Sequence, residues 1–142
     1  MLIPHVVSTE ADKVFVNVLN NQSSALADGD VVVWNGSSPD GVRTTQAGSA
    51  TLSLAVGAAD GAISASAYGL AQAYGYKSAV NCINNKTTAF AVGNILVPVA
   101  SQDYLAYSAA GDGKSGFFYA AQTFATNSTP AALTKKVFIR AL

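Results

Sequence analysis

Apolar and polar residues alternate along most of the chain, and this period of two predicts β-strands. In residues 13–19, for example, Val14, Val16 and Val18 fall on one face of the expected strand. Turns rich in Gly, Asn, Asp and Ser separate the apolar segments, and helical periodicity is nearly absent. The pattern therefore predicts an all-β fold, a compact antiparallel β-barrel or sandwich. Further strands are expected at residues 30–34, 41–45, 51–57, 68–76, 77–83, 94–99, 103–108, 116–124 and 135–142.

Two segments carry nearly the same sequence, ALADGDVVVW at residues 25–34 and AFAVGNILVP at residues 89–98. Matching residues are 64 positions apart, and the match begins upstream with an Asn-Asn pair in each copy. Because the alignment needs no gap, it indicates an internal pseudo-repeat, with repeats at about residues 20–83 and 84–142. We expect two similar half-barrels within one domain.

The glycine of each copy is expected to form a turn before a core strand. Gly29 and Gly93 would adopt a backbone conformation that residues with a Cβ resist. Asp30 and Asn94 follow them, and their side chains can hydrogen-bond the turn backbone. Asp28 and Asp30 could also suggest a calcium loop, since carboxylates at alternate positions bind Ca²⁺. However, the second copy has no carboxylate at either position and no ligating Glu follows the first, so a turn is the favoured interpretation.

Residues 68–76, YGLAQAYGY, alternate large and small side chains. In a strand, the Gly and Ala residues would form a nearly bare face that another segment can approach closely. The opposite face would hold Tyr68, Leu70, Gln72, Tyr74 and Tyr76. Since Tyr is common where one end of a side chain is apolar and the other wet, packing or an interface is favoured over a sugar-stacking platform. The candidate interface residues are Tyr68, Leu70, Tyr74, Tyr76 and, in the N-terminal tail, His5.

Composition limits the partners of the chain. With 142 residues it fits one β-domain at residues 13–142, preceded by an N-terminal arm at residues 1–12. Charged residues make up 11% of the chain, against roughly 25% in ordinary globular proteins, and the formal net charge is zero. Nucleic acid is therefore not an expected partner. Neither a signal peptide nor a membrane span is expected, and we expect other subunits to cover part of this weakly charged surface.

Candidate catalytic chemistry is sparse. His5 is the sole histidine, and Cys82 is the sole cysteine, expected as a small apolar strand residue. Residues 108–115, SAAGDGKS, depart from a P-loop because Ser108 replaces the first glycine and a strand pattern follows. No catalytic residue, cofactor or metal site is expected, and the chain is predicted not to be an enzyme. A small hydrolase with a divergent carboxylate pair remains an alternative.

Taken together, several motifs resemble those of the capsid decoration, or cement, proteins of tailed bacteriophages. The resemblance covers the chain from about Lys13 onward. Its motifs are the AxAxGDVVV start, GVRTT at residues 41–45, LAVGAA at residues 54–59, YGLAQAYGY at residues 68–76, the second AVGNIL, FYAAQTF at residues 118–124 and the terminal KVFIRAL.

This resemblance implies a β-barrel or β-tulip, commonly a homotrimer, on the outer surface of the phage head. There it would clamp neighbouring copies of the major capsid protein, its partner, and residues 1–12 would be an arm that contacts the capsid or the adjacent subunit. It implies synthesis in the bacterial host cytoplasm, assembly into the virion and no active site. The alternative is a carbohydrate- or receptor-binding module that stacks sugars on Trp34 and on Tyr68, Tyr74 and Tyr76.

Overall fold

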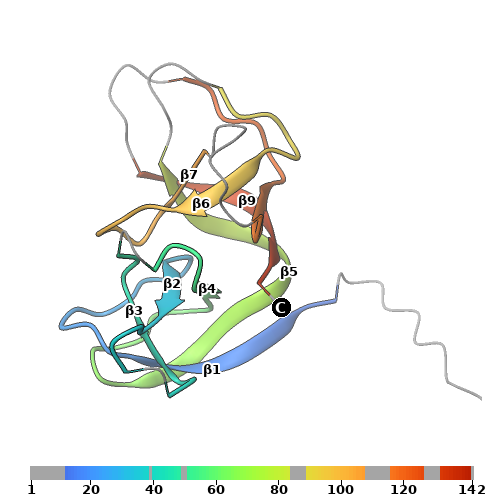
Figure 1. The fold of residues 1–142 in the computed structure, drawn as a ribbon. Helices are drawn as coiled ribbons and strands as arrows, with labels where there is room; N and C mark the ends of the chain where they lie inside the picture. The colour runs from blue at the N-terminus through green and yellow to red at the C-terminus, as the bar shows by residue number, and fades with distance from the viewer. Residues whose placement is uncertain are drawn as a thin grey trace, which may run out of the picture.

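The computed structural model describes residues 12–38, 40–48, 51–83, 89–107, 116–126 and 132–141. These residues form strands and turns without a helix, which confirms the all-β prediction (Figure 1). His5 and residues 1–11 of the expected arm lie outside the described residues, as does the P-loop-like segment 108–115. The strands are β1 (Val14–Asn20), β2 (Val31–Trp34), β3 (Arg43–Thr45), β4 (Ala55–Ala59), β5 (Tyr68–Ile83), β6 (Ile95–Pro98), β7 (Leu105–Tyr107), β8 (Phe118–Ala120) and β9 (Ala132–Arg140).

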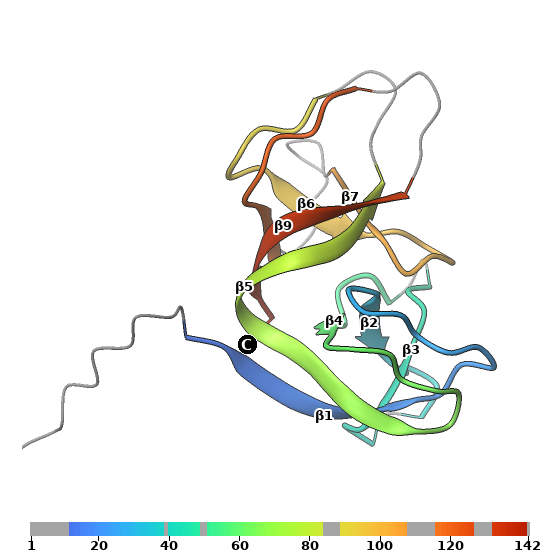
Figure 2. The same cartoon turned by 180° about the vertical axis from the view of Figure 1, so that it is seen from behind.

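The strands form one sheet that folds into two lobes around the long strand β5. The hydrogen-bonded order is β1-β3-β2-β4-β5-β7-β6-β8-β9, and β5 also pairs with both β1 and β9. Each half of the sheet is therefore a closed circuit of five strands, and both circuits contain β5. We call β1 to β4 with the first half of β5 the first lobe, and the second half of β5 with β6 to β9 the second lobe. Figure 2 shows β5 running from one lobe into the other.

The expectation of a wholly antiparallel sheet is wrong at two pairings. Strands β1 and β3 are parallel, and so are β5 and β7. A closed circuit of five strands cannot be antiparallel at every pairing, because five is an odd number, so each circuit contains one parallel pair.

The pairings of the first lobe recur in the second. The second half of β5 takes the place of β1, since it pairs antiparallel with β9 and parallel with β7, as β1 does with β5 and β3. The matched pairs are Leu19↔Tyr68 with Ile83↔Ala132, Val32↔Gly57 with Leu96↔Phe118, and the isolated bridges Leu26↔Ile63 with Phe90↔Phe124. The second half of β5, which starts the second lobe, thus precedes the second copy of the repeated phrase at residues 89–98.

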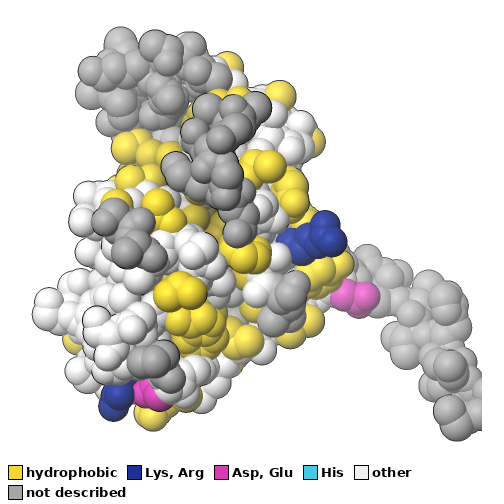
Figure 3. Space-filling view, in the orientation of Figure 1, with side chains coloured by type: hydrophobic (Ala, Val, Ile, Leu, Met, Phe, Trp, Pro, Cys, Tyr) yellow, Lys and Arg dark blue, Asp and Glu magenta, His cyan; other side chains and the backbone are white. Residues whose placement is uncertain are grey.

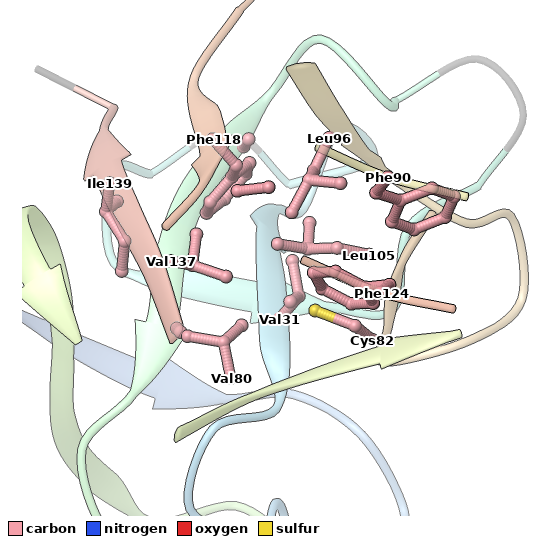
Figure 4. Packing of buried hydrophobic residues seen from close by; sticks show 13 residues of the cluster. Val31, Val80, Cys82, Phe90, Leu96, Leu105, Phe118, Phe124, Val137 and Ile139 are labelled. Atoms are coloured by element: carbon pink, nitrogen blue, oxygen red, sulfur yellow. The ribbon is translucent and has the colours of Figure 1, made fainter. Parts of the chain in front are cut away.

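Each lobe has its own hydrophobic cluster, but the cluster of the second lobe also includes residues from the first. Val31, Ala55 and Ala58 lie on the outside of the first lobe and are buried within the second-lobe cluster. Figure 4 shows Val31 among Cys82, Leu105 and the other labelled side chains of that cluster. Since burial of one Val side chain contributes about 1.5–3 kcal/mol, this shared cluster holds the lobes together.

Several predicted strands have different bounds from those expected, and of residues 116–124 only Phe118–Ala120 form a strand. Residues 51–57 do not form one strand, since residues 51–53 lie in a turn and β4 begins at Ala55. The Thr51 hydroxyl accepts a hydrogen bond from the Gly48 N–H at 2.7 Å, and this side-chain bond stabilises the turn in place of strand pairing. Residues 68–76 and 77–83, expected as separate strands, are one continuous strand of 16 residues, β5.

Candidate interaction surfaces

The two copies of the repeated phrase form the same turn. Residues 27–30 are called the first turn and residues 91–94 the second turn. Gly29 has φ +84° and Gly93 has φ +87°, the left-handed conformation that favours glycine. The Ala27 N–H donates to the Asp30 carboxylate at 2.6 Å, and the equivalent bond to Asn94 measures 2.8 Å. The predicted turn chemistry is therefore confirmed in both copies.

The first turn is docked against the second half of β5. The Asn81 N–H donates to the Gly29 carbonyl at 2.9 Å, and the Asn81 side-chain amide donates to the Asp30 carboxylate at 2.6 Å. A Cβ placed at Gly29 would lie 2.6 Å from the Ala79 carbonyl oxygen, closer than real Cβ atoms come. Burial is the largest influence on Asp30, and it raises the pKa of this carboxyl group.

A buried lysine fixes the same contact. Lys77 is 7% exposed, and its Nζ lies 2.9 Å from a carboxylate oxygen of Asp28 and 2.9 Å from one of Asp60. Burial alone would lower the pKa of Lys77, but its bonds to the two carboxylates outweigh burial and raise it. Burial would also raise the pKa of Asp28, yet hydrogen bonds from the Gly61 N–H and Lys77 lower it. The Lys77 ammonium group already binds the Asp28 carboxylate, so this segment is a turn rather than a calcium loop.

The second turn, in contrast, is exposed. Val92 stands where the first turn has Asp28 and is 64% exposed, and Ile95 stands where β2 has the buried Val31 and is 38% exposed. No atom of the described residues lies within 4 Å of a Cβ placed at Gly93, apart from its own chain neighbours. The second lobe thus presents apolar side chains where the first lobe forms an interface.

The five large residues predicted on one face of residues 68–76 do not share one environment. Tyr68 and Leu70 are exposed, whereas Gln72 is buried and donates to the carbonyls of Tyr74 and Tyr76 at 3.1 and 3.2 Å. Tyr74 and Tyr76 are half-buried. These side chains differ in burial because the pairing of β5 passes from β1 to β9 at Tyr74, where the strand leaves the first lobe for the second. The opposite, small-residue face does admit a close neighbour, since Gly69 lies directly over the Ile63 side chain.

The exposed part of this segment belongs to a surface that we call the β1–β5 face. Residues opposite one another in an antiparallel pair project to the same side of the sheet. Leu19 lies opposite Tyr68, and Asn17 lies opposite Leu70. Phe15, also exposed, follows on the same side of β1. The face is apolar, weakly charged and carried by paired strands.

Candidate chemistry is scarce among the described residues. Cys82 is buried in the second-lobe cluster, and burial raises the pKa of its thiol to about 12. Trp34 packs against the first-lobe cluster and is half-buried. In the described ranges, no group of three or more His, Cys, Asp or Glu side chains could hold a metal ion. No helix within those ranges is long and apolar enough to cross a bilayer.

Charged side chains are few and scattered on the face shown in Figure 3. Comparison with family models, curated proteins and solved structures finds no match for the chain. Neither the Lys77 ion pairs nor the exposure of the second turn was predicted from the sequence. The signal for both was present in the repeat, because Val92 replaces Asp28 between two otherwise similar phrases.

Proposed function

We propose that the protein is a structural component of a phage virion that binds the outer surface of the head as a homotrimer. It would stabilise the shell by clamping neighbouring copies of the major capsid protein. In this proposal each closed circuit of five strands is a small β-barrel, and the two barrels share β5. Beyond the resemblance of its motifs, the observation that carries the proposal is the β1–β5 face, with Tyr68 and Leu70 exposed on a paired, rigid strand.

The physical properties of this face suit a capsid contact. Apolar and aromatic side chains dominate the buried centres of protein interfaces, and charged residues are depleted there. A symmetric trimer would apply three such faces to one shell, so each contact can be weak while the whole binds firmly. The low charge of the chain is consistent with binding that depends on shape and number of contacts more than on electrostatic steering.

The test is co-sedimentation of the purified protein with phage heads that lack it, using Tyr68→Ala and Leu70→Ala. We expect each substitution to weaken attachment at least about tenfold, as loss of a central interface side chain does. The matched control is Leu54→Ala, because Leu54 is exposed but lies on the β3–β4 turn. Folding is checked by circular dichroism. Attachment that survives both face substitutions would overturn this use of the face.

The N-terminal arm gives a second test. Deletion of residues 1–12 should leave a folded protein that attaches to heads more weakly, and unchanged attachment would contradict the proposed role of the arm. The carbohydrate-binding alternative makes a different prediction. If the protein shows no affinity for heads but binds a glycan in a manner lost with Tyr68→Ala, a receptor-binding role replaces the structural one.

A further inference from the structure

The contact between the lobes uses two surfaces, and each has an unpartnered equivalent elsewhere among the described residues. The first turn docks on the second half of β5. The second turn is equivalent to the first, and β1 is equivalent to the second half of β5. The chain therefore carries both sides of this contact a second time, at opposite ends. We propose that a second copy of the chain completes it, with the second turn of one copy docked on the β1 edge of the next.

The backbone of β1 is oriented to accept such a turn. Within the chain, the Asn81 N–H points away from β9 and donates to the Gly29 carbonyl. Asn17 precedes Asn81 by the same 64 positions that separate the two phrases. The Leu19 N–H donates to the Val42 carbonyl on the β3 side, and alternate N–H groups of a strand point to the same edge. The Asn17 N–H thus points to the edge where it would meet the Gly93 carbonyl of a second copy.

The side chains at these surfaces also support self-association. Of the seven large hydrophobic residues that are exposed within the described ranges, four lie on these surfaces, so exposed apolar groups concentrate where the repeat predicts contact. They are Val14 and Phe15 on β1, and Val92 and Ile95 at the second turn. Phe15 takes the place of Ala79, and Val92 takes the place of Asp28. Where the contact within the chain has the carboxylate of Asp28, the contact between chains therefore has an apolar side chain, as interface centres commonly do.

A contact between different surfaces of identical chains is heterologous, and it produces a closed ring or an open filament. A ring of three chains would be the trimer of the proposed function. This inference deepens that trimer, but it rests on self-association and not on attachment to a head. Loss of head binding with the oligomer intact would refute the proposed function alone.

The decisive experiment uses a short bis-maleimide to cross-link variants that each carry one added cysteine besides the buried Cys82. Asn17→Cys and Asn94→Cys correspond to Asn81 and Asp30, whose side chains lie 2.6 Å apart within the chain. Each variant alone should give no linked dimer, whereas their mixture should give one. Cys82 is buried and its pKa is raised to about 12, so it should not react. The positive control is Asp30→Cys with Asn81→Cys in one chain. These two cysteines should link internally, so the product should keep the mass of a single chain.

Three outcomes would overturn the proposal. Linked dimers of Asn17→Cys alone, or of Asn94→Cys alone, would indicate a twofold contact between identical surfaces. An unlinked mixture at a concentration where light scattering detects oligomers would place the contact elsewhere. A chain that remains monomeric at every concentration would show that the two surfaces do not associate.

A charge-exchange series tests the register of the contact. Lys13 precedes Lys77 by 64 positions, so Val92→Asp of one copy should meet Lys13 of the next, as Asp28 meets Lys77. Val92→Asp should associate at least about tenfold more tightly than Val92→Lys, and Lys13→Glu should reverse that order. An order that does not depend on residue 13 would overturn the register. Ile95→Asp should abolish association, and Leu54→Asp, at the same 38% exposure, should not.

Discussion

The first and second turns have nearly the same sequence and the same backbone, yet the first is docked on β5 and the second is exposed. Both hold a glycine with positive φ and a following side chain that accepts a hydrogen bond from the turn. The first turn lies against β5 with Lys77 and Asn81 bonded to it, and the second has no such contact among the described residues. Local sequence therefore determines the turn, and the position of the lobe in the chain determines its environment.

The difference also shows how a repeat adapts to its surroundings. Asp28 in the buried copy has Lys77 as a partner, and Val92 in the exposed copy has no need of one within its own chain. A charged group near the lobe boundary is stabilised only where a counter-charge and backbone donors are already in place. The same substitution made in each turn should thus change stability by unequal amounts. The size of this difference measures how much the docking of the first turn contributes to stability.

The largest expected difference comes from replacing the turn glycines by alanine. Gly93→Ala should reduce the free energy of unfolding by about 1 kcal/mol, the cost of a positive φ at a residue with a Cβ. Gly29→Ala pays the same cost and also places its Cβ against the Ala79 carbonyl, so the loss should be about 3 kcal/mol or more. Urea denaturation of both variants measures the two values.

The predicted difference between these glycines is wrong if both variants lose the same free energy of unfolding. Equal losses would mean that the first turn can move away from β5 without cost, and that the interlobe contact is not tight in solution. Far-ultraviolet circular dichroism of both variants shows whether the sheet is retained.

A smaller difference is expected between two lysines at equivalent positions. Lys77→Met keeps an apolar stem but removes two charge-assisted hydrogen bonds, and we expect a loss of about 1–2 kcal/mol, since both carboxylates are partly solvated. Lys13→Met, at the equivalent position just before β1, should change the stability of the monomer by less than about 0.5 kcal/mol. Thermal and urea unfolding at low protein concentration separates this effect from association.

The result for Lys77 has a clear contrary outcome. A more stable Lys77→Met protein would show that the cost of burying the ammonium group exceeds what Asp28 and Asp60 return. The first turn would then be held by Asn81 and by its glycine, and not by charge.

Several features of the fold were predictable because local physical chemistry decides them. Alternation of apolar residues predicted strands, and Gly followed by Asp or Asn predicted both turns. The parallel pairings and the closure of each circuit through β5 were not predictable, because they depend on contacts between residues far apart in the chain. Alternation alone also could not show where the exposure of β5 changes along the strand, since one face of the strand becomes buried only where the second lobe covers it.

Gln72 illustrates this limit for the candidate site. By alternation it belongs with Tyr68 and Leu70, which are exposed, but it lies opposite Ala58, a residue of the second-lobe cluster. Its side-chain amide bonds two carbonyls of its own strand. A sequence pattern gives the side of a strand on which a residue lies, and only tertiary structure shows what covers that side.

The smallest and most selective difference concerns pH. Asp30 has a pKa raised above its ordinary value of 3.8, so the folded chain keeps this proton where the unfolded chain has lost it. The contribution of Asp30 to the stability of the fold therefore falls as pH rises from about 3.8 through the raised pKa. Asp28 has a lowered pKa, so its contribution is present above 3.8 and is lost as pH falls through the lowered value. The two carboxylates of one turn should have opposite effects.

Asp30→Asn gives the first turn the residue that the second turn has at this position. The variant separates the effect of Asp30 from that of Asp28. Relative to the native chain, the variant should gain stability as pH rises above about 3.8, since it no longer carries a buried charge. Asp28→Asn should be less stable than the native chain at pH 7, and this difference should shrink as pH falls through the lowered pKa of Asp28. Asn94→Asp, at the exposed turn, should show little change with pH and serves as the control. Urea denaturation across this range measures all four proteins. A loss of stability by Asp30→Asn as pH rises would mean that the bonds from Ala27 and Asn81 to the charged carboxylate outweigh its burial, and that the buried turn favours the charge that the exposed turn lacks.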